Sequence, residues 1–402
     1  MIPPFEIPGV GEIKLDEYYP AITDSAQLRE DIVYIIDLAD VMLESGFVDA
    51  LKDKEYDMSG VNANAVAGAF GSTLNNSTAL STFKSKIIKD LVNTLSDDII
   101  KDGKDTTGAV AALRDKIAAI PEGPLSEEDA RKEGEAIYLL ITGALTTSAN
   151  EKNTGLGLGL MLEGLGRHPM IGVETIVDAA ETIVTESGIP VTDKLIQNIE
   201  DKLNESVSKP LGDSNFSDFC DTAFDAVDAI SGITEGNTNP ESLKELVSAD
   251  AEVLEMVKDS VTADLMTEIG MTEDQSEAMQ NVVESVFDAI IEVGCDGEKA
   301  EKEAEAIGSV LEIVTKATDK PEEAEKIFDE KSDEIIEIVA GSEIVEKALT
   351  SLSENGEQDP LDIFGELDED VKKDLGDKIN GYIEENGENA ALDALKSFIG
   401  IN

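Results

Sequence analysis

Apolar residues recur along most of the chain at intervals of three and four positions, which is the spacing of one face of an α-helix. Two stretches show the pattern well: Leu28, Ile32, Ile35, Ile36, Ala39 and Leu43, and then Met279, Val282, Val283, Val286 and Ile290. Similar spacing continues from residue 21 onwards. The pattern therefore predicts an all-α, multi-helical protein in which each helix buries an apolar stripe and keeps a polar face in water.

Capping motifs, prolines and glycines divide this pattern into separate helices. Predicted helix starts are Ser126–Asp129, Asn239–Pro240, Thr272–Gln275 and Asp359–Pro360. Predicted helix ends are Gly46, Gly103, Gly188, Gly232 and Gly294. We expect an elongated or two-lobed helical array, with an N-terminal helical domain at 21–209 and a strongly acidic C-terminal helical domain at 210–402.

Residues 1–20 differ from the rest because Pro3, Pro4, Pro8 and Pro20 exclude a continuous helix. The stretch FEIPGVGEIKL has two short runs around Pro-Gly-Val-Gly, which favours two extended segments. We therefore predict a short extended N-terminal arm. Two interpretations stay open: a loose terminus, or an arm that pairs with a neighbouring subunit.

The chain is extremely acidic. It has 87 acidic and 31 basic residues, a formal net charge of −56, and residues 1–200 hold only 34 of the acids. Such a field repels nucleic acids and anionic lipids and attracts basic proteins and divalent cations. No window approaches the ~20 apolar residues of a membrane span, and the first residues lack a signal-peptide pattern. We expect a soluble protein made in the cytoplasm, with no nucleic-acid or membrane contact and weak divalent-cation binding.

The segment TGLGLGLMLEGLGRHPM, residues 154–170, resembles a ligand site more than any other stretch. A dinucleotide loop is excluded because no strand precedes it and Leu162 stands where the third glycine belongs. We predict a helix capped by Thr154 and ended by Pro169, with an apolar stripe of Leu158, Met161, Leu162 and Leu165. Gly155 and Gly159 mark where another helix approaches closely. Whether this helix only packs or also switches conformation stays open.

Few residues carry the chemistry of a reactive site. His168 is the sole histidine, and its place at a helix end suggests a partner for the helix dipole. Cys220 and Cys295 form no CxxC motif and are interpreted as buried thiols in a reducing compartment. No stretch keeps the spacing of an EF-hand loop. We predict no catalytic, cofactor-binding or metal-binding residue, and no cofactor.

One sequence similarity within the chain suggests duplication. EEDARKEGEAI at 127–137 resembles GEKAEKEAEAI at 297–307, and seven identical residues recur at an offset of 170. Alanine, glutamate and lysine match by chance easily in helices, so duplication and coincidence both stay open. A true duplication would indicate stacked helical units that cover each other's apolar faces.

These observations favour a non-enzymatic structural or assembly protein with protein partners or self-association. A suitable setting is a larger particle such as a phage virion, in a capsid-associated, internal or scaffolding role. One alternative is an acidic interaction module that binds a basic protein or imitates nucleic acid. The other is an enzyme that uses carboxylate acid–base chemistry.

Overall fold

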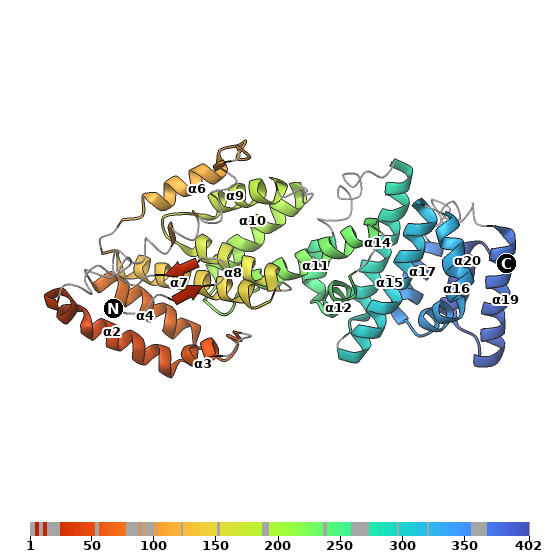
Figure 1. Ribbon diagram of the computed structural model, residues 1–402, viewed down its shortest axis with the longest axis horizontal. Helices are drawn as coiled ribbons and strands as arrows, with labels where there is room; N and C mark the ends of the chain where they lie inside the picture. Colours follow the sequence, from red (N-terminus) through yellow and green to blue (C-terminus); the bar gives the residue numbers. More distant parts are fainter. Residues whose placement is uncertain are drawn as a thin grey trace. The chain divides into compact units, whose positions relative to one another are not determined.

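The structure is a computed structural model, and helices dominate the residues that it describes (Figure 1). These residues are 5–7, 11–13, 25–52, 56–77, 88–89, 93, 100–101, 103–121, 124–150, 153–186, 193–235, 239–258, 273–295, 297–319, 321–354 and 368–401. The predicted all-α fold class is confirmed.

The chain divides into two compact units, Met1–Asp221 and Thr222–Asn402, and the division falls inside helix α11 (Phe216–Glu235). The domain limits expected at 20/21 and 209/210 stay predictions. The first unit contains β1 (Phe5–Ile7), β2 (Gly11–Ile13), α2 (Ser25–Glu44), α3 (Phe47–Lys52), α4 (Ala63–Asn76), α6 (Ala109–Ala118), α7 (Glu127–Ala149), α8 (Thr154–Arg167), α9 (Val173–Glu186) and α10 (Asp193–Ser208). The second contains α12 (Pro240–Ser248), α14 (Glu273–Val293), α15 (Gly297–Asp319), α16 (Pro321–Ala340), α17 (Glu343–Glu354), α19 (Glu369–Asn386) and α20 (Ala390–Ile399).

The two extended segments expected near the N-terminus are strands. β1 and β2 pair antiparallel, and Phe5 lies opposite Ile13 in their register. The sheet has two strands.

Local capping chemistry sets several helix boundaries as expected. The Ser126 hydroxyl accepts the backbone N–H of Asp129 at the start of α7, and Asn239 caps α12 just before Pro240. Gly294 follows α14 in the left-handed region, with φ +53°. The stop expected at Gly232 is wrong, because α11 continues to Glu235. Thr272 and the predicted start at 359–360 lie outside the described residues.

Helix α7 is the centre of the first unit, where it packs against α4 and α8 (Figure 1). Three acidic residues in its first turn complement the helix dipole, and a run from Ala136 to Leu140 is buried. Phe47 lies against both Phe70 and Tyr138, with ring centroids 6.5 and 6.1 Å apart. These aromatic side chains and the aliphatic run of α7 form the core.

The two units share much of their helix order and many packing partners, although α19 precedes the helix of the second unit that matches α10. Both bounds of α15 lie 170 residues after those of α7. The pairs α4–α7, α6–α9, α7–α8 and α8–α9 of the first unit correspond to α12–α15, α14–α17, α15–α16 and α16–α17 of the second. Likewise α10 contacts α8 and α9, as α20 contacts α16 and α17. The sequence similarity at an offset of 170 therefore joins helices that occupy matching places in their own units.

Candidate functional site

A cleft of about 840 Å³ opens in the first unit. Its walls come from α4, α6, α7, α8, α9 and α10 and from residues 209–211. Basic side chains outnumber acidic ones on these walls, although acids greatly outnumber bases in the whole chain. The basic residues are Lys116, Arg131, Lys132, Arg167 and Lys209, and the acidic residues are Glu135, Glu174 and Glu200.

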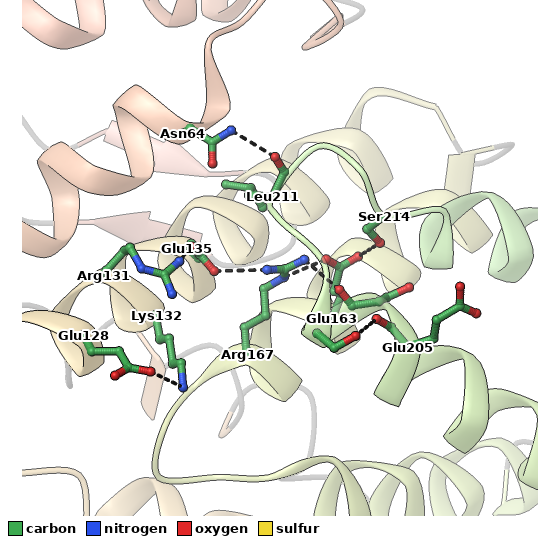
Figure 2. A network of polar contacts seen from close by, with 12 residues as sticks. Asn64, Glu128, Arg131, Lys132, Glu135, Glu163, Arg167, Glu205, Leu211 and Ser214 are labelled. Atoms are coloured by element: carbon green, nitrogen blue, oxygen red, sulfur yellow. Dashed lines mark hydrogen bonds and ion pairs between the residues drawn. The ribbon is translucent and has the colours of Figure 1, made fainter.

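Arg167 lines this cleft. Figure 2 shows its guanidinium between the carboxylates of Glu135 and Glu163. Its guanidinium donates to Glu163 at 2.8 Å, to Glu135 at 3.0 Å and to the carbonyl of Ser206 at 2.9 Å. The side chains of Arg167, Glu135 and Glu163 are each at least nine-tenths buried. The Ser214 hydroxyl donates to Glu163, so this network joins α7, α8, α10 and the segment before α11. Because each of the three guanidinium nitrogens donates to an acceptor on a different element, its first role is to hold these elements together.

The remaining basic groups of the cleft are closer to solvent. Arg131 donates to Glu135 and its side chain is 55% exposed, whereas Lys132 pairs with Glu128 at 3.2 Å. Lys209 pairs with Glu205, and this bond lowers the pKa of the Glu205 carboxyl. Figure 2 shows Arg131 and Lys132 side by side on α7.

Lys116 differs from these groups because the oxygens that it contacts are uncharged. Its ammonium donates to the carbonyl of Ile171 at 2.9 Å and to the Thr175 hydroxyl at the start of α9. An ammonium has three N–H donors, so within the described part of the chain these bonds leave one donor open.

His168 lines the cleft with a buried ring, at the C-terminal end of α8 where a partner of the helix dipole was predicted. It is the C-cap of α8 and only 2% exposed. Its Nδ1 accepts the backbone N–H of Met170 at 3.2 Å, which places the proton of the neutral ring on Nε2. Nε2 lies 3.6 Å from Glu133 Oε1 on α7. The ring therefore links the end of α8 to α7.

The glycine-rich segment is a packed helix, but one detail of the prediction is wrong. Asn153, not Thr154, is the N-cap of α8. A Cβ on Gly159 would meet Ser217 Cα at 2.7 Å, which confirms a close approach there, to α11. Helix α8 also approaches α7 closely at Gly157, where an added Cβ would lie 2.7 Å from the carbonyl oxygen of Gly143. The helix ends before Pro169, as expected.

The two cysteines are free thiols in different surroundings. Cys220 is buried against Gly159, and burial raises the pKa of its thiol, with a further rise from Asp221 and Glu163. Cys295 is half-buried, and burial raises the pKa of its thiol while the Lys299 ammonium opposes part of the rise. The prediction that both are buried is correct only for Cys220.

A thiol-specific disulfide reagent is expected to modify Cys295 in the folded protein and to reach Cys220 only after the first unit unfolds. Thiolates are the reactive form, so modification of both cysteines accelerates as the pH rises. The difference between the two sites then depends on whether the reagent can reach the sulfur. Counting modified thiols by mass spectrometry at pH 8, with and without urea, checks this. A Cys295→Ser variant provides the control, and rapid modification of Cys220 in it without denaturant would contradict the burial.

Within the described residues, no group of three or more histidine, cysteine, aspartate or glutamate side chains is arranged to hold a metal ion. The search for membrane spans over the same residues found no helix that is both long and apolar enough.

Helix α2 presents a second candidate site, an apolar surface. The stripe on α14 is buried as expected, at Val282, Val283, Val286 and Ile290. The stripe predicted on α2 is not: Ile32 is 46% exposed, Ile36 51% and Leu43 60%, and Val33 beside them is 58% exposed. We call these four residues the α2 apolar face. The expectation that this stripe is buried within the chain is therefore wrong.

Sequence reasoning missed both the cleft and the exposure of the α2 apolar face. One signal for the cleft was present: Glu163 and Arg167 are an i, i+4 pair of opposite charge inside an otherwise apolar, glycine-rich helix. Such a pair on a helix that packs on several sides indicates a buried ion network. For α2 no signal existed, because periodicity identifies an apolar face without showing what covers it.

Comparisons with known proteins found no relative of this chain. The chain matches no protein-family model, and it has no significant similarity to a curated protein or to a solved structure.

Proposed function

We propose that this is a non-enzymatic structural or assembly protein that self-associates through α2. The observation that carries the proposal is the α2 apolar face, four large aliphatic side chains that are each about half or more exposed. Isolated exposed apolar residues are ordinary, but a continuous row on one helix is typical of an interaction surface. Leu51 on α3, a helix that contacts α2, is also 37% exposed.

The charges of α2 favour a second copy of the chain as the occupant. Asp37, Asp40 and Glu44 are exposed near the C-terminal end of the helix, and Arg29 is exposed near its N-terminal end. An antiparallel pair of α2 helices centred on Ile36 would bring each Arg29 near Glu44 of the other copy. Such a two-fold contact uses one self-complementary patch twice.

The strand pair supports the same kind of role. A two-stranded sheet is marginal by itself and presents backbone donors and acceptors along its outer edges. A strand from a neighbouring subunit can add to such an edge. The setting that we propose is a larger particle such as a phage virion, and detecting the chain in purified particles by mass spectrometry tests that setting.

Replacing Ile36 with aspartate is expected to weaken self-association at least tenfold. The new carboxylate would lie at the centre of the α2 pair, where two copies face each other without water. Light scattering coupled to size-exclusion chromatography, over a series up to about 100 µM, measures the association constant.

Met170→Asp is the matched control, because Met170 is 47% exposed on a different surface and receives the same charge. It should associate as the unmodified protein does. An unmodified chain that stays monomeric throughout the series would overturn the proposal, and so would an Ile36→Asp variant that associates normally.

A further inference from the structure

We propose that the cleft of the first unit binds a small multivalent oxyanion, an organic or inorganic molecule bearing phosphate or carboxylate groups. Its volume of about 840 Å³ lies within the range of small-molecule sites. Five basic residues against three acidic ones line it, in a chain of 31 bases and 87 acids. Arg167, Lys132 and Lys209 are paired with Glu163, Glu128 and Glu205, so Lys116 and Arg131 are the cleft bases with the most donors left for a ligand.

The cleft offers hydrogen-bond donors as well as charge. Lys116 has a third N–H beyond its bonds to Ile171 and Thr175, and Arg131 exposes half of a guanidinium whose donation to Glu135 uses one of five N–H groups. The backbone at the start of α9 lines the same wall and adds the positive end of a helix dipole. These groups line two sides of the cleft, α6–α9 and α7.

The acidic groups of the cleft limit where an anion can bind. Glu135 is held between Arg131 and Arg167, so most of its charge is compensated. Glu200 lies on the α10 wall and disfavours an anion there, whereas Glu174 lies in the first turn of α9 and offsets part of the positive end of that helix dipole. The favoured position is therefore near Lys116 and Arg131. Because salt limits the reach of charge to about 8 Å at physiological ionic strength, the net charge of −56 does not prevent binding of a small molecule.

The second unit provides an internal comparison. At the positions 170 residues after Lys116, Arg131, Arg167 and His168, it has Val286, Glu301, Glu337 and Ile338. The register holds in three dimensions, because Lys116 contacts Thr175 and their counterparts Val286 and Val345 line one apolar cavity. At these four positions a basic or polar group of the first unit corresponds to an acidic or aliphatic one of the second, whereas Lys132 of the cleft has a basic counterpart in Lys302.

In the second unit, a carboxylate caps the start of α17, the helix that corresponds to α9. Glu303, the counterpart of Glu133, accepts the backbone N–H groups of Glu343 and Ile344 at 3.1 Å and the Ser342 hydroxyl. In the first unit Gly172 replaces Ser342, and Glu133 faces His168 instead. We infer that the units derive from one helical ancestor and that the first has acquired a basic cleft, suited to a ligand.

Isothermal titration of the full chain with pyrophosphate and with citrate, at physiological salt, tests the proposal. We expect saturable binding of at least one of them, weakened about tenfold or more by Lys116→Met, which removes a charge-assisted bond. Arg131→Glu installs the residue of the second unit at an exposed position, so it should keep the fold and also weaken binding tenfold.

Lys299→Met is the control, since it removes an exposed ammonium in the second unit. It should bind like the unmodified chain. Absence of saturable binding for both probes would overturn the proposal, and so would equal losses in Lys299→Met and Arg131→Glu, which would indicate a general charge effect. Because Ile36 lies outside the cleft, Ile36→Asp should bind pyrophosphate and citrate as the unmodified chain does. This result separates the test of the cleft from the test of self-association.

Discussion

Replacing Arg167 with methionine is expected to destabilise the first unit by about 3–5 kcal/mol, the usual cost of breaking a buried ion pair from one side. The loss leaves Glu135 and Glu163 close together, buried and without their shared cation. It also removes the donor to the Ser206 carbonyl, which ties α10 to α8. Urea unfolding followed by circular dichroism measures the change, and hydrogen exchange of α7 peptides assigns the transition to the first unit.

Arg131→Met is the matched control, because Arg131 pairs with the same Glu135 carboxylate but is 55% exposed. Glu135 keeps its buried bond to Arg167 in this variant, and a pair with one half-exposed partner contributes about 1 kcal/mol, so the variant should unfold almost as the unmodified protein does. A triple variant with Arg167→Met, Glu135→Gln and Glu163→Gln should recover part of the loss, because no unpaired charge is then buried. Equal, small effects of Arg167→Met and Arg131→Met would show that the network does not hold the unit together.

The helices themselves were the most predictable part of this protein. Their starts depend on contacts within three residues, as at Ser126 and Asn239, and such contacts are written in the local sequence. The end of α11 was missed because Gly232 has a helix-stopping residue type but lies within a longer helical run. Propensity is a weak prior that tertiary packing overrides.

The candidate sites were much less predictable. Arg167 reaches partners 32 and 39 residues away, and nothing local indicates that Glu135 or Ser206 lies beside it. Similarly, the α2 and α14 stripes have the same periodicity, yet one is exposed and the other buried. Which apolar face is covered depends on the order in which helices pack, and that order is a property of the whole unit.

The contact between α4 and α7 should be as sensitive as the ion network. Gly134→Ala is expected to cost about 3 kcal/mol, at the upper end of overpacking effects. A Cβ on Gly134 would lie 2.1 Å from the Ala67 carbonyl oxygen and 2.9 Å from Gly71 Cα. Both are backbone atoms of a neighbouring helix, so no rotamer change relieves the overlap and the two helices must separate. The free energy of unfolding from urea titration gives the cost.

Gly68→Ala on α4 is the matched control, because a Cβ there would meet nothing within 4 Å. It should stabilise the protein by about 0.5–1 kcal/mol through helix propensity alone. Gly134→Ala has the same propensity gain, so the difference between the two variants isolates the steric overlap. The second unit tolerates Ala304 at the matching position of α15, which means that the α4–α7 approach is tighter than the α12–α15 approach. If Gly134→Ala proved as stable as Gly68→Ala, α7 and α4 would not be in backbone contact, and the central packing of the first unit would have to be revised.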